Sequence, residues 1–240
     1  MTVTAHGPRS LHDAATVLRS WEAALRAPAP LRGAAVLTNL HPDGDAVLDL
    51  PLAEVAALAT TYLAEASGYH VEGVLECAGC GMLLDVRLRL SDLLDDPPAT
   101  EGRDRGARFA LRPPTPRDLA AASDDADAYG LLLRRCVSWA DGTPVDPAAL
   151  GPADLDEIDG ALESLAGPAL PLLRATCPDC GGAATGTVDV TDLLWRHVEI
   201  EAHALLRDVS QLAATFGWRE ADVLALSPYR RSAYLALVTG

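Results

Sequence analysis

Five cysteines occur in this chain of 240 residues, and four of them stand in two copies of one short pattern. The pattern Cys-x-x-Cys-Gly occupies residues 77–81 and residues 177–181. Two intervening residues let the chain turn so that both sulfurs face one ion, and the glycine adopts backbone angles that other residues resist. Two such pairs supply the four thiolates of a closed tetrahedral zinc site. The sequence therefore predicts one structural Zn²⁺ with the ligands Cys77, Cys80, Cys177 and Cys180.

The two cysteine pairs belong to a longer repeat with an offset of 100 residues. After each pair, at 86–90 and at 186–190, apolar and polar residues alternate as they do in a strand. Incoming strands are expected at 69–76 and at 170–176. Each unit then ends in a potential helix N-cap, Ser91 or Thr191. The matching positions are Cys77/Cys177, Cys80/Cys180, Gly81/Gly181, Ser91/Thr191, Asp92/Asp192, Leu93/Leu193 and Leu94/Leu194. We expect two zinc-knuckle β-hairpins, related by this internal repeat, that meet at one metal.

Other uses of such cysteines stay open. A Cys-x-x-Cys pair can act as a redox dithiol, but that motif usually occurs once, beside a βαβ pattern that is not found in this sequence. Four thiolates can also hold a single iron ion. Unliganded cysteines are disfavoured because the repeat aligns them. The fifth cysteine, Cys136, falls on an apolar helical stripe and is expected to be a small buried residue.

The composition limits the classes of function. The formal net charge is −15, and arginine supplies all 19 positive charges. A protein this acidic repels nucleic acid on average, which disfavours the usual role of a zinc ribbon. No apolar run approaches the ~20 residues that span a membrane, and residues 1–9 lack the pattern of a signal peptide. We expect a cytoplasmic protein, because reduced thiolates persist in that compartment.

Apolar residues at helical spacing predict amphipathic helices on both sides of the hairpins. The longest begins at Thr191 and ends at Gly217, and the last is expected to pack back on it through Tyr229, Ala233, Tyr234 and Leu237. Thr115 is a candidate N-cap with Pro116 at the first helical position. A further hairpin is expected around a turn at 41–45. The expected helices cover residues 11–26, 51–68, 117–122, 129–139, 155–165, 191–216, 219–226 and 228–237.

These elements predict an α+β fold with two zinc-knuckle hairpins surrounded by amphipathic helices. Four segments of one integrated domain are expected. They are an N-terminal helical and hairpin segment (1–68), the first knuckle unit (69–97), a central linker with helices (98–168), and the second knuckle unit with the long C-terminal helices (169–240). His197 and His203 lie on different faces of the long helix and are expected to be surface or packing residues. No motif for nucleophilic catalysis or phosphate binding was found in the sequence, so no enzyme is predicted.

Several motifs in the second half form a recognisable set. They are RPPTPRDL at 112–119, LRRCV at 133–137, CPDCG at 177–181, DVTDLLW at 189–195, FGWRE at 216–220 and LALSPYRRSAYL at 224–235. This set resembles the T4-type baseplate hub assembly chaperone family of contractile phage tails and related injection systems. The likeness covers about residues 70–240. It departs at 182–184, where a histidine and aromatic residues are expected.

The resemblance implies a non-enzymatic chaperone or structural component for a baseplate hub, with hub or spike proteins as partners. Two arginine pairs, Arg134 with Arg135 and Arg230 with Arg231, could contact such a partner or lie on solvated helix faces. The alternative is a zinc-ribbon regulator that binds nucleic acid. A rubredoxin-like or dithiol electron carrier is the enzyme-class rival.

Overall fold

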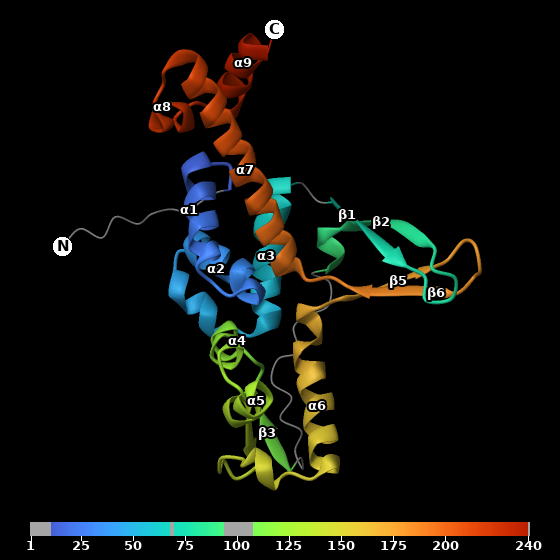
Figure 1. Cartoon of the computed structure of the whole chain (residues 1–240). Coiled ribbons are helices and arrows are strands. Elements are labelled where there is room, and N and C mark those ends of the chain that lie inside the picture. The colour runs from blue at the N-terminus through green and yellow to red at the C-terminus, as the bar shows by residue number, and fades with distance from the viewer. Residues whose placement is uncertain (1–10, 68–69, 94–107, 240) are drawn as a thin grey trace, which may run out of the picture.

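Helices make up most of the structure, and two small β-hairpins stand out from them to one side (Figure 1). The structure is a computed structural model that describes residues 11–67, 70–93 and 108–239. The helices follow one long axis, and the hairpins project across it. The predicted α+β class, with antiparallel hairpins and a long C-terminal helix, is confirmed. The helices lie beside the hairpins, whereas the sequence predicted them on all sides.

The largest hydrophobic core lies where three N-terminal helices pack against the longest helix. These elements, which we call the helical body, are α1 (Ala14–Leu25), α2 (Arg32–Leu40), α3 (Leu52–Ser67) and α7 (Val190–Phe216). Short 3₁₀ turns, η1 (Ala29–Leu31) and η2 (Gly44–Asp49), connect them. The N-cap of α1 is Asp13, whose Oδ2 accepts a hydrogen bond from the Thr16 backbone N–H at 2.9 Å. In the sequence, Ser10 followed by Asp13 resembles a capping box, but Ser10 lies outside the described residues.

The predicted hairpin around residues 41–45 is wrong, because the chain forms a helix and a 3₁₀ turn there. In α2, Val36, Leu37 and Leu40 are buried together at helical spacing. Gly44 begins the 3₁₀ turn in contact with α2, where a Cβ atom would lie 2.4 Å from the Thr38 carbonyl oxygen. The short apolar runs at 35–37 and 46–48 do not distinguish a strand from a buried helix.

The long helix α7 contains 27 residues, a length of about 40 Å. Its N-cap is Asp189, whose Oδ1 accepts from the Asp192 backbone N–H at 3.0 Å, so the predicted cap Thr191 is wrong. Thr191 instead approaches α2, and a Cβ on Gly33 would lie 2.1 Å from the Thr191 carbonyl oxygen. The predicted end at Gly217 is confirmed, since this residue has a φ of 71°.

A smaller central region carries a second core, which includes Phe109, Leu133 and Ile158. The helix predicted at 129–139 ends at Cys136, because the next three residues pair with β3. The predicted N-cap Thr115 is confirmed. The region consists of β3 (Phe109–Leu111), α4 (Pro116–Ser123), α5 (Ala128–Cys136), β4 (Val137–Trp139), η4 (Pro147–Ala149), α6 (Pro152–Ala166) and η5 (Gly167–Ala169).

A buried carboxylate ties α4 to its neighbours. The Asp118 side chain is 1% exposed and pairs with Arg112 and Arg135, each at 2.6 Å. Burial alone would raise the pKa of Asp118, but Arg112, Arg135 and Thr115 together hold that pKa well below its usual range. Arg135 therefore has a structural contact, and Arg134 pairs with Asp127 at 3.3 Å.

The C-terminal end of α7 carries α8 (Glu220–Leu224) and α9 (Pro228–Thr239). Tyr234 of α9 meets the rings of Phe216 and Trp218, with centroid distances of 6.1 and 4.8 Å. The predicted packing of α9 on α7 is thus confirmed for Tyr234 and is wrong for Tyr229 and Leu237, which are 90% and 73% exposed. Of the two neighbouring arginines, Arg231 pairs with Asp208 at 2.9 Å, whereas Arg230 is exposed.

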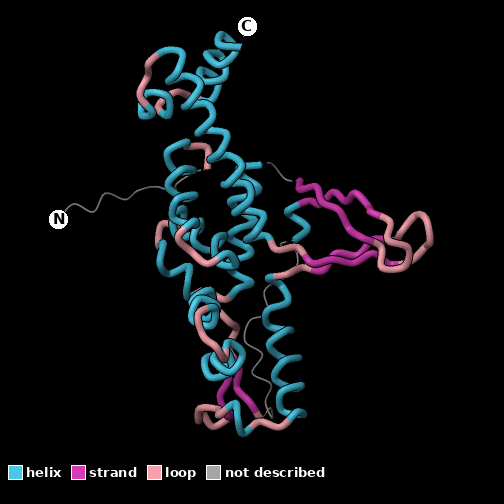
Figure 2. Tube along the Cα trace, in the orientation of Figure 1, coloured by secondary structure: helices cyan, strands magenta, loops and turns pink. Residues whose placement is uncertain are grey.

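The two hairpins lie side by side, as the paired strands in Figures 1 and 2 show. In the first, β1 (His70–Glu76) pairs with β2 (Leu83–Arg89), followed by the 3₁₀ turn η3 (Leu90–Leu93), which contains Ser91. In the second, β5 (Leu172–Thr176) pairs with β6 (Ala183–Thr187). The expected strands are thus present, although β6 ends before the predicted residue 190. We call these four strands and their turns the hairpin unit.

Candidate metal centre

All four cysteines of the repeated pattern converge at the tip of the hairpin unit. The four Sγ atoms lie within 4.8 Å of one another, although about 100 residues separate the two pairs. Across the pairs, the Sγ atoms of Cys77 and Cys180 are 3.5 Å apart, and those of Cys80 and Cys177 are 3.7 Å apart. All five cysteines of the chain are free thiols in the structure. The predicted residues are therefore together, and they could hold a metal ion.

The sulfur distances fit a tetrahedral ion. Zn–S bonds of about 2.3 Å at tetrahedral angles place neighbouring sulfurs about 3.8 Å apart. The two cross-pair distances, 3.5 and 3.7 Å, are close to that value. They are far longer than the ~2.05 Å of a disulfide bond. The arrangement thus suits four bonds to one central ion.

Each turn is built by the same backbone hydrogen bonds. In the first, the Gly81 N–H donates to the Cys77 carbonyl at 2.8 Å; in the second, the Gly181 N–H donates to the Cys177 carbonyl at 3.0 Å. Both glycines have positive φ, 74° and 71°, a region that favours glycine. In the folded hairpins, each turn therefore directs its pair of sulfurs toward one point.

Packing between the hairpins brings the two turns together. The bridge between Cys77 and Ala184 links the first hairpin to β6. Behind it, Leu75 packs so closely on β6 that a Cβ at Gly186 would lie 2.7 Å from the Leu75 Cδ2. The buried residues of this small core are Leu75, Cys77, Cys177 and Ala184. Two of the four candidate ligands are thus also part of the core.

The surroundings of the first cysteine pair shift the pKa values of both thiols. Backbone N–H groups of Cys80 and Gly79 lower the pKa of Cys77 to about 7. At Cys80 the Met82 N–H acts in the same direction, but the neighbouring thiols Cys180, Cys177 and Cys77 outweigh it and raise the pKa of Cys80 to about 12. The neighbouring thiols thus disfavour the thiolate form of Cys80, and a bound cation would favour that form.

The cysteines differ in exposure, and one further sulfur lies beside them. Cys77 and Cys177 are 1% exposed, whereas Cys80 and Cys180 are exposed. The Met82 Sδ lies 3.9 Å from the Cys177 Sγ, a contact that the sequence analysis missed. In the sequence, the only feature that marks Met82 is its position directly after Gly81, the glycine of the first motif. With four protein sulfurs around one point, an ion would keep no open position for a substrate.

The other residues considered in the sequence lie elsewhere. Cys136 is buried in the central core, and its Sγ is 3.8 Å from the Asp118 Oδ2. Burial raises the pKa of Cys136 to about 11. On α7, burial lowers the pKa of His197, and the His203 ring meets Trp21 at 5.5 Å. Cys136 is thus buried as predicted, and the two histidines agree with the predicted surface or packing roles.

Comparison with models of protein families, with curated proteins and with solved structures gives no match to this chain. Among the helices described, none combines the length and the hydropathy needed to cross a bilayer.

Proposed function

We propose that the four cysteines bind one Zn²⁺ as a structural centre. The observation that carries this proposal is the convergence of four sulfurs, from two distant turns, at near-tetrahedral spacing. Thiolates favour soft and borderline ions, and a closed shell of four thiolates is the usual structural zinc site. Metal analysis of protein purified without added metal tests it, with one zinc per chain expected. A red, iron-containing protein or a metal-free protein would contradict it.

We also propose that the two hairpins are copies of one ancestral unit. The matched sequence positions support this, and so do the matched turns, each with a glycine of positive φ and the same backbone hydrogen bond. Under this proposal the metal lies at the junction of the two copies, and each copy contributes half of the ligands. Neither copy alone would form a closed site.

The chain as a whole is proposed to act as a non-enzymatic assembly chaperone or structural component for the baseplate hub of a contractile, phage tail-like injection system. The motif resemblance supports this role, as does a centre without an open coordination position. The hairpin unit also exposes apolar side chains that a partner could cover, namely Val74, Leu83 and Leu172 at 58%, 66% and 52%. The reduced cysteines suit assembly in the cytoplasm.

Co-expression with candidate hub and spike proteins tests the assembly role. We expect the chain to co-purify with one of them, or to raise its yield of soluble protein. A matched variant with Val74, Leu83 and Leu172 changed to serine should retain zinc and lose that effect. If neither hub nor spike proteins are bound or kept soluble by the wild-type chain, the proposed role fails, although the zinc centre could still be correct.

Nucleic-acid binding is the competing proposal. Three arginines of the hairpin unit, Arg87, Arg89 and Arg174, are exposed on its strands. Acidic side chains of the same hairpin offset them, and Glu72 lies 3.7 Å from Arg87. We therefore expect no retention on DNA at about 150 mM salt. Retention that weakens steeply as the salt concentration rises would support the regulator instead.

A further inference from the structure

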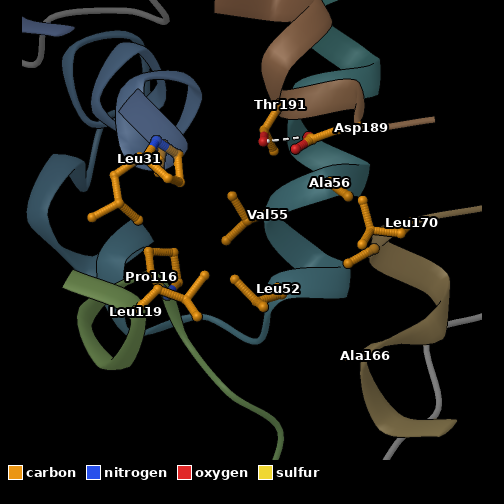
Figure 3. Close-up of a pocket in the computed structure, with 13 residues that line it drawn as sticks. Leu31, Leu52, Val55, Ala56, Pro116, Leu119, Ala166, Leu170, Asp189 and Thr191 are labelled. Carbon is orange, nitrogen blue, oxygen red and sulfur yellow. Dashed lines mark hydrogen bonds between the residues drawn. The ribbon is translucent and has the colours of Figure 1, made fainter. Parts of the chain in front are cut away.

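An apolar cavity lies beside the segments that lead into β5 and out of β6, and none of the cysteines lines it (Figure 3). Its volume is about 180 Å³. Five separate parts of the chain line it: η1 with α2, the start of α3, the start of α4, the region where α6 leads into β5, and the start of α7. Because β5 follows one wall and β6 precedes another, a group in this cavity would touch both the helical body and the base of the hairpin unit.

The walls of the cavity are almost entirely apolar. Leu31, Val55 and Pro116 are buried, whereas Leu170 at the rim is 49% exposed, which gives the cavity an opening to solvent. An engineered apolar cavity of about 150 Å³ binds benzene. A cavity of 180 Å³ therefore accommodates one aromatic ring or one branched aliphatic side chain. Water is not stabilised in this cavity, because few polar groups there could form hydrogen bonds with it.

One acidic side chain stands at the edge of this apolar surface. Asp189 is exposed, and its Oδ1 accepts hydrogen bonds from the Thr191 Oγ1 at 2.6 Å and from the Asp192 N–H at 3.0 Å. Both bonds use Oδ1, so within the described residues Oδ2 is free to accept from a further donor. Figure 3 shows Asp189 and Thr191 together at one side of the lining residues.

We propose that this cavity is a docking site for a partner protein segment that inserts one aromatic or branched apolar side chain and places an arginine or lysine beside Asp189. Charge complementarity favours a basic segment, because a carboxylate borders the cavity and the chain carries a net charge of −15. A single buried apolar anchor with a polar rim is the usual form of an interface hot spot. The inference rests on the proposed binding role but not on the partner being a baseplate protein.

Short capped peptides test the site on the intact, zinc-loaded chain. We would titrate Ac-Phe-Arg-NH₂, Ac-Phe-Glu-NH₂ and Ac-Ala-Arg-NH₂ and follow the methyl NMR signals of Leu31, Val55 and Leu119. The first peptide should give saturable shifts at these methyls, with a Kd of about 1–10 mM. Replacing its arginine by glutamate should weaken binding about two- to fivefold. The alanine peptide should not saturate.

Three variants and one control identify the site. Ala56→Leu fills the cavity and should abolish binding of both phenylalanine peptides, and Ala169→Leu provides a second filling variant should the first fail to fold. Ala57→Leu, on the same helix but outside the lining, is the matched control and should bind as the wild type does. Asp189→Asn keeps a good N-cap and should remove the preference for arginine over glutamate.

Three results would overturn the proposal. They are no saturable shift with any peptide, equal binding of the alanine and phenylalanine peptides, or an arginine preference that survives Asp189→Asn. Because the probes are synthetic, a negative result leaves co-purification with hub or spike proteins as a separate question. Conversely, peptide binding without such co-purification would support the site and argue against the proposed baseplate role.

Discussion

The hairpin unit and the helical body differ in the interactions that stabilise them. The main core contains nineteen of the described buried residues, seventeen of them in the helical body, whereas the core of the hairpin unit contains four, of which two are cysteines. Each buried aliphatic side chain contributes about 1.5–3 kcal/mol, so the body is stabilised by apolar burial. The hairpin unit buries too few aliphatic side chains to be stabilised by apolar burial alone. Two-stranded hairpins are marginal in water, and small units of this kind usually depend on a metal or a disulfide.

The difference between the two cores indicates which region a bound metal would stabilise. A four-thiolate centre contributes on the order of 10 kcal/mol in zinc-finger peptides, which exceeds what the small core between the hairpins supplies. The ion would thus decide whether the hairpin unit is folded, and it would matter little to the helices. The two regions should therefore respond separately to changes at the metal and in the core.

The largest expected effect follows from Cys180→Ser. Loss of one thiolate opens the centre, so zinc should be lost and the hairpin unit should unfold, while α1, α2, α3 and α7 stay helical. Hydrogen exchange measures both regions in one experiment. Amides of β1, β2, β5 and β6 should exchange rapidly, and those of α7 should remain protected. Cys77→Ser should behave in the same way. Cys136→Ser, outside the cluster, should keep the zinc and serves as the control.

The reverse experiment changes the helical body. Leu194 is fully buried in its core, and Leu194→Ala should cost about 2–5 kcal/mol of unfolding free energy while zinc content stays at one per chain. Denaturant unfolding followed by helical circular dichroism gives this value. Ile200, on the same helix but 64% exposed, offers the matched Ile200→Ala control, expected within about 0.5 kcal/mol of the wild type. Loss of zinc from the Leu194 variant would show that the two regions are not separate.

The central region is an intermediate case, with a small core and a buried ionic group. Asp118→Asn should cost about 1–3 kcal/mol, because both arginines keep some contact with solvent and can be hydrated. The low pKa of Asp118 makes this contribution present above its unfolded pKa of about 4 and progressively lost as the pH falls below that. The difference between wild type and variant should thus shrink from pH 6 to pH 3. A difference that is constant across this range would mean that the charge of Asp118 contributes nothing.

The smallest effect is expected from a substitution that changes packing within the hairpin unit but leaves the four cysteines unchanged. A methyl group at residue 186 would press on Leu75, so Gly186→Ala should cost about 1–2 kcal/mol and leave the zinc bound. Gly160→Ala on exposed α6, where a Cβ meets no neighbour, should instead stabilise by up to about 1 kcal/mol. Thermal unfolding compares the two. Zinc loss in the Gly186 variant would indicate that packing, and not the ion, holds the hairpins together.

The sequence predicted the cysteine cluster well because its signals are local. Each turn needs only a short motif, and the motif Cys-x-x-Cys-Gly occurs twice in the sequence, which predicts four ligands. The helices with clear periodicity, such as α3, α6 and α7, were predicted within a few residues. The segment at 31–50 was not, since its apolar runs are too short to show a period.

Features that depend on distant contacts were not visible in the sequence. Asp118 was expected only in the first turn of a helix, yet it binds Arg112 and Arg135 because tertiary packing brings three elements together. The N-cap of α7 is Asp189 and not the predicted Thr191, which lies against Gly33 of α2. The apolar cavity is formed by five separate stretches, and no single stretch indicates it.

The central claim is that two distant turns share one ion, and X-ray absorption at the zinc edge tests it most directly. The account predicts one zinc per chain with four sulfur neighbours at about 2.3 Å. Nitrogen or oxygen neighbours in place of two sulfurs, or two zinc ions per chain, would contradict it, because either result means that each cysteine pair binds metal without the other.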